Sequence, residues 1–249
     1  MSAATAYNQA NPFTPMFGKV PAYMAGRELL IDEMVQAFEF PGSDPNLCSI
    51  FVGARGTGKT ALLTYLGYRA QQEGWIVADT TASSGMLDDI LQRIDDAASH
   101  LLTADRSRKL TGIGVASIAN VSWENIDAPG NWRTKMNAIF SQLEETQTGV
   151  AITVDEIDGD LSEMVELVTT YQHFVREGKK VALLMAGLPY KVSSLLSGKS
   201  TSFLRRAARH ELGSIPLYEV REAFRLTIED AGKVIDDDAL DLACEAIGG

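Results

Sequence analysis

One short run of residues in this chain has the types and spacing needed to bind a polyanion. Residues 53–60 read Gly-Ala-Arg-Gly-Thr-Gly-Lys-Thr and match the pattern G-x-x-x-x-G-K-[ST] at every fixed position. Because glycine has no Cβ, a loop containing Gly53, Gly56 and Gly58 can take positive φ and turn its backbone N–H groups around an anion. The helix expected to follow points its positive end at the same place. The spacing therefore predicts a phosphate-binding loop.

The side chains at the end of this loop extend the chemistry to a nucleotide and its metal. Lys59 is expected to reach the β- and γ-phosphates as a point charge, and Thr60 to offer its hydroxyl to Mg²⁺. The alternative is a glycine-rich turn that matches by chance, but this run lies between an apolar strand and an amphipathic helix, as the motif requires. The residues expected to contact the nucleotide are Gly53, Gly56, Thr57, Gly58, Lys59, Thr60 and Ala61.

A second group of residues that could do chemistry follows 150–154, a run of apolar or β-branched residues that predicts a strand buried on both faces. Such a strand delivers Asp155 and Glu156 at its carboxyl end, where a protein with a phosphate-binding loop holds Mg²⁺. We expect Asp155 to bind the ion through water and Glu156 to polarise the water that attacks the γ-phosphate. Turns favour acidic residues in any case, so the pair indicates catalysis only together with the loop.

The elements that must position these residues alternate between strands and helices. Period and composition predict strands over 48–52, 75–79, 150–154 and 180–187, with a last strand that ends at Leu217–Tyr218. This order predicts an α/β fold with a parallel five-stranded sheet flanked by helices. The residues 109–127 are β-type with glycines among them and predict a hairpin, either a contact for a partner or a cover for a sheet edge. Helices are expected over about 29–38, 59–72, 86–103, 132–146, 161–176, 190–197, 219–232 and 236–247.

Composition limits the class of protein and its partners. The chain has 249 residues and is 45% hydrophobic, which is enough for a full core. A formal charge of −11 disfavours nonspecific binding to nucleic acid. Cys48 and Cys244 lie far apart in apolar patterns, as expected of thiols in a reducing compartment. Neither a leader peptide nor a membrane-spanning window is evident, so we expect a cytoplasmic protein without membrane contact.

The order of these parts resembles the AAA+ class of P-loop ATPases, in particular the branch near origin-recognition-type initiators and STAND-like regulators. Residues 53–60 and 151–156 resemble the two Walker motifs. The resemblance implies that ATP and Mg²⁺ are the cofactors, that Gly26 and Arg27 form the loop around the adenine, and that Phe203–Arg206 carries an arginine finger. Arg205 or Arg206 would then act on the nucleotide of a neighbouring subunit, which implies a homo-oligomer.

The resemblance also implies a division of the chain. Residues 1–24 are expected to form an irregular arm, 25–217 the nucleotide-binding domain, and 218–249 the start of a small helical lid. The lid stops just where relatives place a further arginine, so we expect the chain to be an excerpt of a longer protein. A second departure lies at the end of the fourth strand, where Met185–Leu188 contains no Asn or Thr to orient water.

Several functions are compatible with these residues. The leading hypothesis is an ATP-hydrolysing switch or motor that acts on a partner or an attached domain. The missing polar sensor motivates a rival, a nucleotide-binding regulatory scaffold with little or no hydrolysis. A GTPase is disfavoured because no N-K-x-D occurs, and a small-molecule kinase is disfavoured because the acidic pair and the lid favour water as the acceptor. Whether the client is DNA or a protein is left open, because the fold and its phosphate chemistry serve both.

Overall fold

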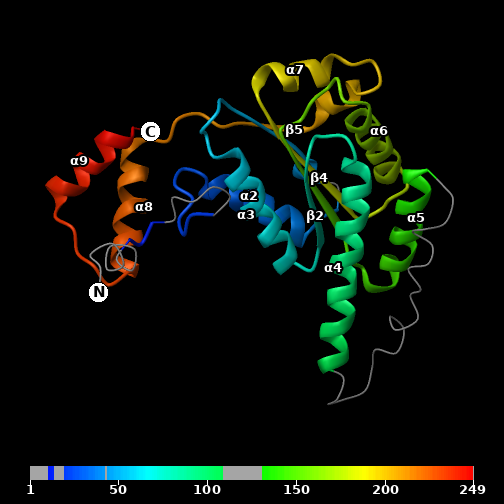
Figure 1. The fold of residues 1–249 in the computed structure, drawn as a ribbon, viewed down its shortest axis with the longest axis horizontal. Coiled ribbons are helices and arrows are strands. Elements are labelled where there is room, and N and C mark those ends of the chain that lie inside the picture. The colour runs from blue at the N-terminus through cyan, green and yellow to red at the C-terminus, as the bar shows by residue number, and fades with distance from the viewer. Residues whose placement is uncertain (1–10, 14–19, 43, 109–130, 249) are drawn as a thin grey trace.

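The sheet at the centre of the molecule is parallel throughout (Figure 1). The computed structural model describes residues 11–13, 20–42, 44–108 and 131–248. In these ranges the strand order is β2-β3-β4-β1-β5, so β4 lies between β1 and β3. This arrangement confirms the predicted five-stranded α/β fold. The strands are β1 (Cys48–Val52), β2 (Ile76–Thr81), β3 (Val150–Asp155), β4 (Val181–Gly187) and β5 (Ala208–Glu211).

Helices cover both faces of the sheet and bury its central strands (Figure 1). Successive strand residues point to opposite faces, so Ile50 packs in one core cluster and Phe51 in the other. Residues 181–187 of β4 are all buried. One face is covered by α2 (Glu28–Glu39) and α3 (Lys59–Gln72), and the other by α4 (Met86–Arg108), α5 (Trp132–Leu143), α6 (Ser162–Arg176) and α7 (Pro189–Ser197).

Most predicted helices agree with the structure to within a few residues. The helix expected over 86–103 continues to Arg108 in α4. In α2, the side chains of Ile31, Met34 and Phe38 form the face that packs on the sheet, and Leu29 is 81% exposed. The hairpin predicted over 109–127 lies outside the described residues.

The fifth strand does not lie where the sequence pattern placed it. The prediction that a strand ends at Leu217–Tyr218 is wrong, because Leu217 begins helix α8 (Leu217–Asp230) directly after Pro216, and proline is well suited to the start of a helix. The strand is β5, which pairs with β1 at the sheet edge. Along β5, half-buried residues (Ala208 and His210) alternate with exposed ones (Arg209 and Glu211), as an edge strand allows.

Helices α8 and α9 (Asp237–Ile247) form a small unit beside the sheet (Figure 1). They pack on each other through Val220, Leu240 and Cys244. The described part of the N-terminal arm lies against α8, where the ring of Phe13 is 5.0 Å from that of Phe224. Of the helices in the described ranges, none is both long enough and apolar enough to cross a membrane.

The backbone turns sharply at the carboxyl end of β3. Glu156 has φ of 54°, in the left-handed region that residues with a Cβ rarely adopt. Its N–H donates to the Asp155 carboxylate, with 2.8 Å between Nα and Oδ1, and the N–H of Ile157 donates to Ala186 O at 3.0 Å. These bonds hold the strained residue in place.

We expect Glu156→Gly to have a free energy of unfolding about 1 kcal/mol higher than that of Glu156→Ala, because alanine keeps the Cβ that the left-handed backbone disfavours. Urea unfolding of the two purified variants measures the difference. Gln147 also has positive φ, 56°, so its Gly and Ala variants should differ in the same direction.

A helical position supplies the opposite control. Glu166 lies within α6, where glycine should be less stable than alanine by about 1 kcal/mol. Equal stability of the two Glu156 variants would contradict the left-handed turn.

Candidate functional site

The loop between β1 and α3 contains one glycine at a crowded position and two glycines with positive φ. A Cβ at Gly53 would lie 2.5 Å from Thr57 Oγ1 and 2.7 Å from Leu212 O, so a side chain does not fit there. Gly58 has φ of 81° and directly precedes the first residue of α3, a helix of 14 residues. The loop therefore ends at the positive end of a helix, which favours an anion in front of it.

Lys59, the first residue of α3, folds back onto this loop. Its ammonium donates to Gly53 O at 3.0 Å and to Ala54 O at 2.5 Å. The pKa of Lys59 is lowered, mainly by burial. The carboxylates of Asp155 and Glu156 oppose this shift, and the neighbouring Arg55 guanidinium adds to it. The ammonium is thus held at the mouth of the loop by neutral carbonyl oxygens, which an anionic ligand can replace.

Thr60 and Asp155, 95 positions apart in the chain, lie side by side. The Thr60 hydroxyl donates to the Asp155 carboxylate, with 2.5 Å between Oγ1 and Oδ2. A hydroxyl oxygen and a carboxylate at one point are ligands that suit Mg²⁺, which is bound through few protein oxygens and keeps several waters. The two residues therefore fit the metal that the sequence pattern implies.

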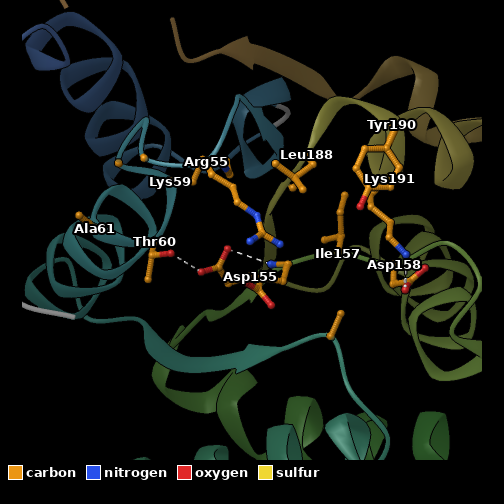
Figure 2. Close-up of a pocket in the computed structure, with 15 residues that line it drawn as sticks. Arg55, Lys59, Thr60, Ala61, Asp155, Ile157, Asp158, Leu188, Tyr190 and Lys191 are labelled. Carbon is orange, nitrogen blue, oxygen red and sulfur yellow. Dashed lines mark hydrogen bonds and ion pairs between the residues drawn. The ribbon is translucent and has the colours of Figure 1, made fainter. Parts of the chain in front are cut away.

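A cavity of about 640 Å³ opens in front of these residues (Figure 2). Figure 2 shows Thr60 and Asp155 on one side of it, Arg55 extended from the loop toward Asp155, and Lys191 with Asp158 on the opposite side. Of the residues that the structure describes, three cations and three carboxylates line the cavity, namely Arg55, Lys59 and Lys191 with Asp155, Glu156 and Asp158. The volume is that of a small-molecule pocket, and these positive and negative charges are equal in number.

The end of β4 contributes an apolar wall to this cavity. A Cβ at Gly187 would lie 2.6 Å from Ile157 Cγ1, so Gly187 cannot hold a side chain unless Ile157 moves. Leu188 lines the cavity next to it. At Gly187, the packing of Ile157 therefore leaves no room for a polar side chain.

The structure brings most of the predicted site residues together. The predicted residues that line the cavity are Gly56, Gly58, Lys59, Thr60, Ala61, Asp155 and Glu156. Gly53 and Thr57 belong to the loop but do not line the cavity. The Thr57 hydroxyl donates to Ala54 O within the loop, at 3.0 Å.

The other predicted residues lie outside this cavity. Gly26 and Arg27 line a separate hollow of about 350 Å³ with Glu219 of α8, and Arg27 Nη2 donates to Gly213 O at 2.8 Å. Arg205 and Arg206 are exposed at the end of a 3-10 turn (Ser202–Arg206), where Arg205 Nε donates to Leu196 O at 3.2 Å.

Among the lining residues that were not assigned from the sequence, three are charged. Arg55 occupies a variable position of the loop pattern, and Asp158 belongs to the same acidic run as Asp155. Lys191 lies four residues after the end of β4, in the first turn of α7. The one indication in the sequence was that Lys191 follows closely after a predicted strand, because the carboxyl ends of parallel strands border such sites.

The chain has similarities to known proteins in sequence pattern and in fold. A family model described as "AAA domain" matches residues 43–196. No curated protein matches the chain by sequence.

Solved structures with the same fold share little sequence with this chain. The ORC2 protein of Aeropyrum pernix, in ADPNP–ADP complexes, is 14% identical with a TM-score of 0.60 over 92% of this chain and 59% of its own. Cdc6p of Pyrobaculum aerophilum is 15% identical, with a TM-score of 0.57 over 95% of this chain and 58% of its own. AMPPCP-bound DnaA of Aquifex aeolicus is 17% identical, with a TM-score of 0.54 over 88% and 56%.

The chain thus spans less than two thirds of the length of each of these three proteins. The family model, in contrast, covers more than half of this chain, from the turn before β1 to α7. By this match and by its sheet order, the chain belongs to the AAA domain family and has the AAA+ P-loop fold seen in initiator-type proteins.

Proposed function

We propose that this chain binds and hydrolyses ATP and acts as an AAA+ switch or motor that couples the state of the nucleotide to a partner or to a further part of the protein. The observation that supports this most directly is the hydrogen bond between Thr60 and Asp155 at the mouth of the glycine loop. It joins the two sequence motifs at one point, as metal-dependent phosphate chemistry requires.

The identity of the nucleotide is supported by the proteins with this fold. The Aeropyrum pernix ORC2 protein was solved with ADPNP and ADP, and the Aquifex aeolicus DnaA protein with AMPPCP, which are adenine nucleotides or their analogues. We infer that ATP and ADP occupy the cavity of this chain. Lys59 would exchange its carbonyl partners for phosphate oxygens, and the loop N–H groups would bind the phosphates.

Thr60 and Asp155 are the residues that would hold Mg²⁺. When bound, the ion neutralises charge on the phosphates. Glu156 supplies the base: its carboxylate lines the same cavity, is exposed to solvent and lies next to Asp155. We propose that it holds the attacking water and accepts a proton from it.

Gly26 and Arg27 are proposed to border the adenine, although they contact the segment that leads to α8. A Cβ at Gly26 would lie 2.7 Å from Glu219 Oε2 and 3.0 Å from Ile215 Cγ2. The loop before α2 is therefore packed against the connection between the sheet and α8. We propose the division given by the sequence, with 25–217 as the nucleotide-binding domain and 218–249 as the start of a lid.

Arg205 and Arg206 are proposed to act on the nucleotide of a neighbouring copy. Both are exposed and lie outside their own cavity, so their guanidinium groups are available to another subunit. A cation supplied in this way stabilises charge in the transition state of phosphoryl transfer.

A second candidate function is a nucleotide-binding scaffold with little hydrolysis. Gly187, packed on Ile157, favours it, because the end of β4 offers no polar side chain to orient water. The two candidates differ in turnover and share nucleotide binding.

Lys59→Ala is expected to weaken binding of ATP roughly tenfold to a hundredfold, because one charge-assisted contact to phosphate is lost. Isothermal titration with ATP and Mg²⁺ measures the affinity. Lys199→Ala, at an exposed position outside the cavity, is the control and should bind like the wild type. Unchanged affinity of Lys59→Ala would remove the basis of the proposed site.

Glu156→Gln is expected to lower the rate of phosphate release by about a hundredfold or more while ATP still binds, because the amide cannot accept the proton from water. Phosphate release under multiple-turnover conditions measures the rate, and Glu166→Gln on α6 is the control. A wild-type chain that binds ATP but releases no phosphate at any protein concentration would favour the scaffold. A rate per subunit that rises with concentration, and falls in Arg205→Ala or Arg206→Ala, would support the finger in a neighbouring copy.

A further inference from the structure

An ion pair between Lys191 and Asp158 lies on the cavity wall that faces the glycine loop (Figure 2). The distance between Lys191 Nζ and Asp158 Oδ2 is 2.6 Å, and the two side chains are 30% and 33% exposed. Lys191 comes from α7, which follows β4, and Asp158 from the turn that follows β3. Each is thus joined to a strand that ends at the proposed site.

The position of Lys191 is unfavourable for a lysine on local grounds. It is the third residue of α7, and a cation in the first turn of a helix is repelled by the positive end of the helix dipole. The Asp158 carboxylate accepts a hydrogen bond from the Lys191 ammonium, which offsets this repulsion. The same bond raises the pKa of Lys191 and lowers the pKa of Asp158. Both groups are therefore charged at neutral pH, and a second anion near Lys191 would also be stabilised.

The uncharged residues of this wall include Tyr190, whose hydroxyl can donate one hydrogen bond but carries no charge. Ile157 and Leu188 are apolar, and Gly187 has no room for a side chain. Among the residues that line the cavity in the described part of the chain, the other cations, Arg55 and Lys59, come from the glycine loop. Lys191 is thus the cationic side chain on the wall opposite the loop.

We propose that Lys191 exchanges Asp158 for the terminal phosphate of a bound nucleoside triphosphate, so that it reports the γ-phosphate in place of the missing polar residue on β4. This role rests on the proposed nucleotide site. The exchange is easy because a partly exposed ion pair is worth little against water. When the ligand is a diphosphate, which lacks the terminal phosphate, the ammonium keeps its ion pair with Asp158.

The two partners of the pair separate this role from a structural one. If the ion pair only fastens α7 to the turn after β3, then breaking it from either side has effects of the same sign. If Lys191 binds phosphate and Asp158 competes for it, removal of Lys191 weakens triphosphate binding, whereas removal of the Asp158 charge strengthens it. The ratio of triphosphate to diphosphate affinity is therefore the quantity to measure.

The test measures dissociation constants for AMPPCP and ADP, each with Mg²⁺, in the whole chain. Lys191→Met is expected to lower the AMPPCP preference roughly tenfold, as the loss of one charge-assisted contact predicts, and Asp158→Asn to raise it. Lys191→Arg keeps the charge and should retain most of the preference, which shows that the fold is intact. Lys179→Met breaks an ion pair with Glu144 that lies outside the cavity and should leave the ratio unchanged.

Two different results overturn this role. An unchanged ratio in Lys191→Met, or a shift of the same sign in Lys191→Met and Asp158→Asn, overturns the role of Lys191 alone, provided that Lys59→Ala still binds poorly. A wild-type chain that binds neither AMPPCP nor ADP overturns the proposed nucleotide site and this role with it.

Discussion

The hydrogen bond between Thr60 and Asp155 depends on the order of the strands more than on either residue. Thr60 lies in the first turn of the helix after β1, and Asp155 is the last residue of β3. The two strands are separated by β4 alone, and all three run in the same direction. Because parallel strands end at a common edge, the loop after β1 and the acid at the end of β3 border the same space.

This constraint explains why so much of the site could be predicted from the sequence. The loop residues are consecutive, and their spacing alone specifies a backbone that curls around an anion. Asp155 and Glu156 could be predicted as site residues because a run of five apolar or β-branched residues ends just before them. In both cases the chemistry is encoded within one strand and the residues that follow it, so no knowledge of distant contacts was needed.

Where prediction failed, the deciding contacts are distant in the sequence. β5 is a short edge strand in which Arg209 and Glu211 are charged, and its pairing with β1 is not visible in any local period. Lys191 lines the cavity because β4 lies next to β3, a fact of topology that the sequence around Lys191 does not contain. The stretch Met185–Leu188 was noted only for the polar residues that it lacks, since the crowding of Gly187 by Ile157 joins residues that are distant in the sequence.

The N-terminal arm gives helix α8 a second attachment to the body of the protein. One attachment is the connection after β5, where Arg27 donates a hydrogen bond to Gly213 O. The other is the arm before α2, where the Tyr23 hydroxyl donates to Asp230 at 2.5 Å and Phe13 packs on Phe224. A displacement of α8 away from the arm would break both contacts. The hydrogen bond and the ring contact therefore add to the free energy needed for such a displacement.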